Sequence, residues 1–164
     1  MMTGLLIVGH GSRDTNSNDE FEACVAAYRS ARPDLIVAQG YVELAQPSLA
    51  TALRDLAQQT DTVVVLPLFL FAAGHVKNDI PLALAQARSE FPDTCFTVAR
   101  ALGVHPQLVD LAFERARVQV EEARDASKTA VIVVGRGSSD PDANADFCKV
   151  VRLFAEGRSL GWVL

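Results

Sequence analysis

Three side chains that could bind a metal ion each follow an apolar run of the sequence. These are His10, Glu43 and His75, and longer, more polar segments separate the runs. Two imidazoles and one carboxylate suit a borderline divalent ion such as cobalt, nickel, iron or zinc. A neutral imidazole can also accept a proton near neutral pH, because its unperturbed pKa is about 6.5. The residue types therefore predict a site that binds a divalent ion and exchanges protons, provided that the fold brings them together.

Each histidine taken alone also has a structural explanation, since an imidazole at a strand end can bond the backbone and cap a loop. His105 favours that explanation, because Pro106 follows it and suits the first turn of a helix. Gly9-His10-Gly11 lacks the third glycine of a dinucleotide-binding loop and has Asp14 in its place, which disfavours nucleotide binding. Arg13 and Asp14 are expected to form an exposed ion pair.

An apolar segment stands directly before His75. It consists of Phe69, Leu70, Phe71, Ala72, Ala73 and Gly74. Its composition is compatible with ordinary core that extends past a strand. Its place beside the predicted metal site is equally compatible with a surface that covers the face of a flat macrocycle, because ligand pockets are mostly hydrophobic with few polar anchors.

The elements that must position these residues follow an alternating pattern. Apolar, β-rich runs alternate with segments of helical period, and the runs are continuous, as expected when helices cover both faces of a parallel sheet. The fold class is therefore α/β, with a doubly wound, mostly parallel four-stranded sheet flanked by helices and an extra C-terminal βα unit. Strands are predicted at 5–9, 35–41, 62–68, 95–99 and 130–135, and helices at 19–31, 48–59, 78–91, 106–124 and 145–156.

The predicted topology brings the metal-binding candidates together. With right-handed crossovers and the common strand order 2-1-3-4, the first strand lies between the second and the third. Ligands bind outside the carboxyl ends of such strands, where the order reverses. His10, Glu43 and His75 follow the first, second and third strands in turn. We therefore expect their side chains to converge at one edge of the sheet.

Composition excludes several classes of protein. Apolar residues make up 49% of the 164 residues and charged residues 21%, which is typical of a globular domain. The longest apolar run is too short for a membrane span, and the N-terminus does not resemble a signal peptide. Three widely spaced cysteines and a net charge of -5 favour a cytoplasmic protein that binds neither nucleic acid nor a membrane.

The sequence also repeats itself at an offset of 126 residues. Val8-Gly9-His10-Gly11-Ser12 aligns with Val134-Gly135-Arg136-Gly137-Ser138, and Asp14, Asn18 and Phe21 align with Asp140, Asn144 and Phe147. This repeat predicts one domain at 1–126 and, at 127–164, the first strand and helix of a partial second copy. A strand without its own domain could pair with another chain, so a homodimer or a domain-swapped assembly is a candidate.

Three ordered motifs together resemble the CbiX/SirB family of sirohydrochlorin chelatases, which has the class II chelatase fold. The resemblance covers the first domain, and the partial repeat resembles the start of the second half of long family members. The motifs are Gly9-His10-Gly11-Ser12-Arg13-Asp14, Glu43-Leu44-Ala45-Gln46-Pro47-Ser48-Leu49 and Pro67-Leu68-Phe69-Leu70-Phe71-Ala72-Ala73-Gly74-His75-Val76-Lys77-Asn78-Asp79-Ile80-Pro81.

The resemblance implies that the chain inserts a divalent metal into sirohydrochlorin without ATP. Cobalt for cobalamin is the first expectation and iron for sirohaem the alternative, with no cofactor beyond the substrate metal (Co²⁺, or Fe²⁺ or Ni²⁺). His10 would be a metal ligand and the proton acceptor, and His75 the second ligand. Glu43 and 69–74 would contact the tetrapyrrole, with Glu43 also assisting at the metal.

Two other outcomes stay open from the sequence. The first is a metal carrier that uses the same histidines without catalysis, and the second is an inactive fragment of a chelatase. Arg136 stands where the repeat would place a second His10, so the second loop is not expected to bind metal.

Overall fold

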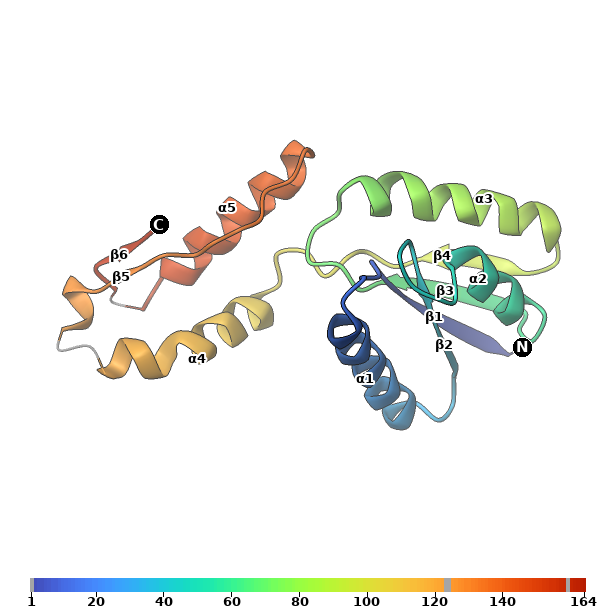
Figure 1. The fold of residues 1–164 in the computed structure, drawn as a ribbon, viewed down its shortest axis with the longest axis horizontal. Helices are drawn as coiled ribbons and strands as arrows, with labels where there is room; N and C mark the ends of the chain where they lie inside the picture. The colour runs from blue at the N-terminus through green and yellow to red at the C-terminus, as the bar shows by residue number, and fades with distance from the viewer. Residues whose placement is uncertain (1, 123–124, 159) are drawn as a thin grey trace. The chain divides into compact units, whose positions relative to one another are not determined.

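The computed structural model describes residues 2–122, 125–158 and 160–164. Contacts between residues divide the chain into two compact units, Met1–Ala101 and Leu102–Leu164 (Figure 1). In the second unit, α4 (Pro106–Glu122) has bounds close to the predicted 106–124, and the first unit contains all three metal-binding candidates.

The first unit is built on a four-stranded parallel sheet with the order β2-β1-β3-β4. This is the predicted α/β architecture and the predicted strand order. Six of the seven residues of β1 are buried, because this strand has a neighbour on each side and helices on both faces. The strands are β1 (Thr3–Gly9), β2 (Ile36–Tyr41), β3 (Thr62–Pro67) and β4 (Cys95–Val98).

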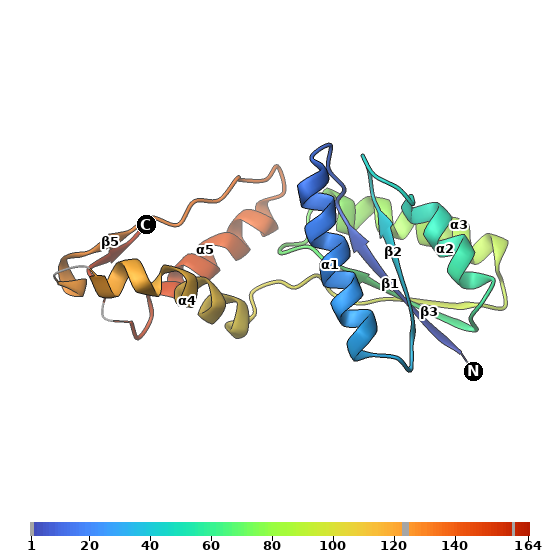
Figure 2. The ribbon, with the colours of Figure 1, turned by 60° about the horizontal axis from the view of Figure 1, so that its bottom comes forward.

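Helices cover the two faces of this sheet in different numbers. α1 (Thr15–Ala31) lies on one face, and α2 (Leu49–Ala57) and α3 (Ile80–Glu90) lie on the other (Figure 2). Successive residues of a strand point to opposite faces. Leu6 and Val8 accordingly pack with α2 and α3, whereas Leu5 and Ile7 pack with Val25 of α1.

Side-chain caps set the start of two helices earlier than the sequence pattern indicated. α1 begins at Thr15 rather than at residue 19, because the Asp14 carboxylate accepts a hydrogen bond from the Asn16 N–H. In the second unit α5 (Pro141–Ala155) begins four residues before the prediction of 145, with Asp140 as the equivalent cap.

The second unit pairs two helices and a short two-stranded sheet. The ring of Phe113 on α4 (Pro106–Glu122) lies 5.7 Å from that of Phe154 on α5. η2 (Ala126–Lys128) precedes β5 (Ala130–Val131), which pairs in parallel with β6 (Trp162–Val163). β5 is shorter than the predicted 130–135, because within the described residues it has one neighbouring strand and that strand is equally short.

The two copies of the sequence repeat, 126 residues apart, also share local geometry. Ser12 N–H donates to Asn18 Oδ1, and the Asn18 amide donates back to the Ser12 carbonyl. Ser138 and Asn144 form the same reciprocal pair. The strand registers match too, since Gly4 lies opposite Ile36 and Ala130 opposite Trp162. The domain boundary at 126 stays a prediction. It follows from the sequence repeat, whereas the division by contacts groups α4 with α5.

No helix within the described ranges is long and apolar enough to cross a membrane. Cys24, Cys95 and Cys148 are free thiols at exposed positions.

Candidate metal centre

The loop after β1 presents His10 at the carboxyl edge of the sheet. Gly11 follows with φ +90°, a conformation that favours glycine. A Cβ at Gly11 would overlap the carbonyl oxygen of Glu43, so the two loops approach each other at backbone distance. The Glu43 N–H donates to the His10 carbonyl at 3.0 Å. Backbone contacts thus hold the His10 and Glu43 loops together.

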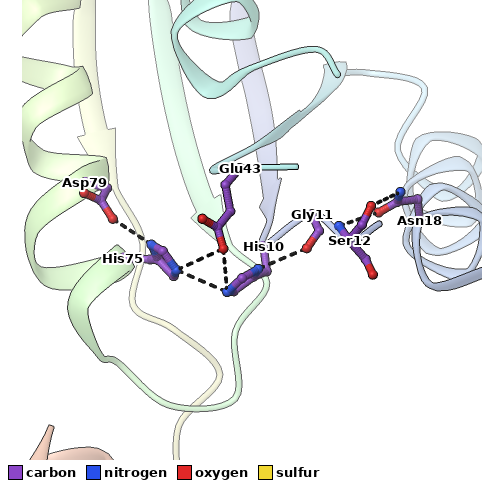
Figure 3. Close-up of polar contacts among 7 residues, drawn as sticks. All are labelled: His10, Gly11, Ser12, Asn18, Glu43, His75 and Asp79. Carbon is purple, nitrogen blue, oxygen red and sulfur yellow. Dashed lines mark hydrogen bonds and ion pairs between the residues drawn. The ribbon is translucent and has the colours of Figure 1, made fainter. Parts of the chain in front are cut away.

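Glu43 lies in a tight turn after β2. The Ala45 N–H donates to the Glu43 carbonyl at 2.8 Å across Leu44, whose φ is +61°. A side chain other than glycine rarely adopts positive φ, and such residues gather at functional sites. The turn places the Glu43 carboxylate beside the His10 and His75 rings (Figure 3).

His75 begins the π-helical turn η1 (His75–Asp79), which leads directly into α3. The Ile80 N–H donates to the His75 carbonyl, five residues earlier, and this spacing defines the wider turn. Insertions of this kind are frequent at functional sites. Asp79 closes the turn, and its Oδ2 lies 2.6 Å from His75 Nδ1.

The three candidate side chains converge on one point. His10 Nε2 lies 3.1 Å from His75 Nε2, and Glu43 Oε1 lies 3.5 Å from the first and 3.9 Å from the second (Figure 3). All three ligand atoms lie within 4.8 Å of one another. Their side chains are 39%, 46% and 33% exposed for His10, Glu43 and His75, so the cluster is open to a large ligand.

Hydrogen bonds at the far side of each ring decide what the cluster can bind. His10 Nδ1 lies 3.0 Å from the Gly11 carbonyl, which can only accept, so His10 Nδ1 carries the proton. A neutral ring then has a bare lone pair on Nε2. The same holds for His75 beside the Asp79 carboxylate. Two lone pairs and a carboxylate that face one another need a cation or a shared proton between them.

The spacing of the two Nε2 atoms suits a metal ion. With metal–nitrogen bonds of about 2.1 Å, the 3.1 Å separation corresponds to an angle of roughly 95° at the ion. This angle lies between the ideal octahedral and tetrahedral values, so the pair can share one ion of either geometry. Three protein ligands leave coordination positions open for a substrate.

The predicted apolar contact residues occupy the loop between β3 and η1. The Phe69 ring lies 6.3 Å from the His10 ring and 6.4 Å from the His75 ring, and Phe69 also packs against the core. Leu70 is 57% exposed. Phe71, Ala72 and Ala73 are half-buried and Gly74 is exposed. The structure thus brings Phe69 next to the metal-binding candidates and leaves Leu70 as an exposed apolar side chain in the same loop.

A cleft of about 490 Å³ is lined by residues of α1 and of the loops after β1 and β2. Tyr41 lines it and donates to Glu22 Oε1 at 2.9 Å. Burial, and then the hydrogen bond to Glu22, raises the pKa of Tyr41 to about 12. Arg13 also lines this cleft, along with Ser12, Thr15, Asn18, Asp19, Leu44, Ala45 and Gln46.

His105 and Asp79 differ in how well the sequence predicted their roles. His105 Nδ1 accepts from the Gln107 N–H at the start of α4, in keeping with the helix-start role favoured for it. No role for Asp79 was predicted from the sequence, although the spacing His75-x-x-x-Asp79 places the two side chains on one helical face and could have indicated the pair.

Comparisons with known proteins relate this chain to one protein family. The family model described as CbiX matches residues 4–119. A sirohydrochlorin cobaltochelatase of Priestia megaterium is 37% identical over 94% of this chain and 51% of its own length. A sirohydrochlorin ferrochelatase of Bacillus subtilis is 29% identical over 95% of this chain and 59% of its own.

A solved structure shares the fold across almost the whole chain. SirB from Bacillus subtilis with Fe³⁺ superposes with a TM-score of 0.88 at 25% identity, over 99% of this chain and 64% of that one. The chain therefore spans between half and two thirds of the length of these three proteins.

Proposed function

The chain belongs to the CbiX/SirB family of sirohydrochlorin chelatases, and on that premise we propose that it inserts a divalent metal ion, Co²⁺ first of all, into sirohydrochlorin without ATP. One observation carries the proposal: the His10, Glu43 and His75 ligand atoms lie within 4.8 Å of one another at an open edge of the sheet. The exposed Leu70 and the nearby Phe69 ring provide an apolar surface for a flat macrocycle.

The geometry supports a simple division of the reaction. The two Nε2 atoms and Glu43 Oε1 hold the incoming ion while leaving positions open. The macrocycle gives up two pyrrole N–H protons as its nitrogens take over the ion, so one M²⁺ enters and two H⁺ leave. We assign the first proton to His10, which is released as a ligand when the ion moves. Glu43 attracts the cation and stabilises the imidazolium that forms.

The proposal also specifies which metal ion is inserted. The two curated relatives carry cobaltochelatase and ferrochelatase names, and a site of two imidazoles and one carboxylate binds either ion. We expect Co²⁺ to be inserted faster than Fe²⁺ or Ni²⁺. Parallel anaerobic assays with the three ions, followed by the absorbance of the metallated product, would decide; faster Fe²⁺ insertion would make the sirohaem reaction the function.

Removing either histidine tests the site itself. We expect His10→Ala and His75→Ala each to lower the insertion rate about 100-fold or more, because each substitution removes a metal ligand. His10→Ala also removes the proton acceptor. His105→Ala is the matched control and should insert metal at the wild-type rate. Circular dichroism would show that all three variants are folded.

The outcomes separate the alternatives. Wild-type rates in both His10→Ala and His75→Ala would contradict the assignment. A wild-type protein that binds Co²⁺ but shows no saturable binding of sirohydrochlorin would be a metal carrier rather than a chelatase.

Two further assignments belong to the proposal. We propose that 127–164 is the opening unit of a second copy, whose Arg136 replaces the metal-binding histidine, and that a homodimer or domain-swapped assembly forms. The free cysteines suit a reducing cytoplasm. Light scattering of the purified chain would give the oligomeric state.

A further inference from the structure

We propose that Asp79 is a positioning residue that fixes the tautomer and orientation of His75 and makes it the stronger of the two imidazole ligands. The inference rests on the proposed metal-binding role of His10, Glu43 and His75. It adds a residue that does not itself touch the ion, and it predicts that the two histidines differ in function.

The contact between Asp79 and His75 is short and directional. Asp79 Oδ2 lies 2.6 Å from His75 Nδ1, on the ring atom opposite the one that faces His10 (Figure 3). A carboxylate that accepts from Nδ1–H keeps the proton on that nitrogen and leaves Nε2 free to bind metal. The same bond fixes the rotation of the ring toward His10 and Glu43.

The backbone is shaped to allow this contact. His75 and Asp79 are the first and last residues of η1, and the wide turn ends where α3 begins at Ile80. Asp79 occupies the cap position of α3, yet its side chain makes no capping hydrogen bond. A helix-capping role therefore does not account for the aspartate, whereas the bond to His75 does.

The two imidazoles have different partners behind them. His10 Nδ1 bonds a neutral backbone carbonyl at 3.0 Å, whereas His75 Nδ1 bonds a carboxylate at 2.6 Å. A charged acceptor makes the stronger hydrogen bond and increases the electron density that the ring offers to a metal. His75 is therefore the ligand that retains the ion, and His10 is the one that releases it during transfer.

Cobalt binding without tetrapyrrole tests this inference. Wild type, Asp79→Ala and Asp79→Asn would be titrated with Co²⁺ by calorimetry. We expect Asp79→Ala to weaken binding about 10- to 100-fold. Asp79→Asn should lose less Co²⁺ affinity, since its uncharged amide oxygen can still accept a hydrogen bond from Nδ1–H. It also provides a second folded variant if Asp79→Ala is unstable.

Asp34→Ala is the matched control. Asp34 is exposed, forms a 2.6 Å contact with Arg32, and precedes β2, at the opposite edge of the sheet from the metal-binding candidates. The substitution removes the same charge from the chain and should leave the Co²⁺ affinity unchanged. An equal loss in this control would overturn the inference, because it would make the effect one of net charge.

A spectroscopic measurement distinguishes positioning from a merely structural role. In ¹⁵N–¹H spectra of the metal-free protein, His75 should be the Nδ1–H tautomer in wild type and a mixture of tautomers in Asp79→Ala. His10 should keep its tautomer in both. Affinity and His75 tautomer that both stay as in wild type would overturn the inference.

These outcomes are separable from those of the proposed function. If wild type binds Co²⁺ but never inserts it, the chelatase proposal fails while the role of Asp79 is still decided by the titrations. If wild type inserts Co²⁺ and the Asp79 variants bind it unchanged, the role of Asp79 fails alone.

Discussion

Glu43 provides the carboxylate that faces both Nε2 atoms of the metal centre. Its Oε1 lies 3.5 Å and 3.9 Å from the two Nε2 atoms. Glu43→Gln keeps the shape of the side chain and removes its charge. The attraction between two unit charges about 4 Å apart is roughly 1 kcal/mol in water and larger near a protein surface. We expect Co²⁺ affinity, measured by calorimetry, to fall about tenfold or more.

Glu90→Gln is the control for this prediction. The Glu90 side chain is 48% exposed, close to the 46% of Glu43, but it pairs with Arg54 on another part of the first unit. Its substitution should leave Co²⁺ binding as in wild type. Equal affinities for Glu43→Gln and wild type would remove Glu43 from the site.

Tyr41 gives the first unit a dependence on alkaline pH. Its folded pKa is raised to about 12, against about 10 for an unfolded tyrosine. The neutral phenol is therefore favoured by folding. The stabilisation is complete below about pH 10 and is lost as the pH rises toward about 12, since the unfolded chain releases its proton first.

A comparison with Tyr41→Phe isolates that contribution. From about pH 9 to about pH 11, we expect the free energy of unfolding to fall by roughly 1 kcal/mol more in wild type than in the variant. Urea denaturation at a series of pH values would measure it. Parallel curves for the two proteins would show that Tyr41 keeps its ordinary pKa when folded.

At the scale of elements, the loops after β1 and β2 act as one structure. Gly11 makes this possible, because any Cβ there would overlap the Glu43 carbonyl. We expect Gly11→Ala to displace the Glu43 loop and to lower Co²⁺ affinity at least tenfold, by analogy with the loss of a supporting contact at other metal sites. Calorimetry would measure the affinity, and circular dichroism would verify the fold.

The repeat supplies a matched control for this substitution. Gly137 has φ +77°, close to the +90° of Gly11, but among the described residues no atom beyond its chain neighbours lies within 4 Å of the position of its Cβ. Gly137→Ala therefore introduces the same backbone strain, about 1–2 kcal/mol, without the overlap. It should leave Co²⁺ binding unchanged, and equal losses in both variants would show that the Gly11 effect does not act through Glu43.

At the scale of the whole molecule, the metal centre belongs to one unit. His10, Glu43, His75 and Asp79 all lie within Met1–Ala101. A compact unit with its own core can fold by itself. We expect a fragment of residues 1–101 to keep the sheet, by circular dichroism, and to bind Co²⁺ within about threefold of the affinity of the whole chain. A folded fragment with much weaker binding would mean that Leu102–Leu164 contributes to the site.

The sequence pattern predicted the alternation of strands and helices, and the common strand order 2-1-3-4, which the structure has, then brought the site residues together. Alternating apolar runs and helical segments, together with the handedness of βαβ connections, permit few arrangements. Any arrangement with β1 between β2 and β3 places His10, Glu43 and His75 at one edge. Periodicity was less informative at helix starts, because the caps Asp14 and Asp140 act from outside the apolar pattern.

The way in which the site residues face one another became known from the three-dimensional structure alone. The Nε2 atoms of His10 and His75 lie 3.1 Å apart although 65 positions separate the residues, and the partners of their Nδ1 atoms set the tautomers. The grouping of α4 with α5 was also decided there, through the rings of Phe113 and Phe154. Apolar periodicity reports which face of an element is buried, whereas ring orientation and helix pairing depend on loop paths between distant segments, which no local pattern encodes.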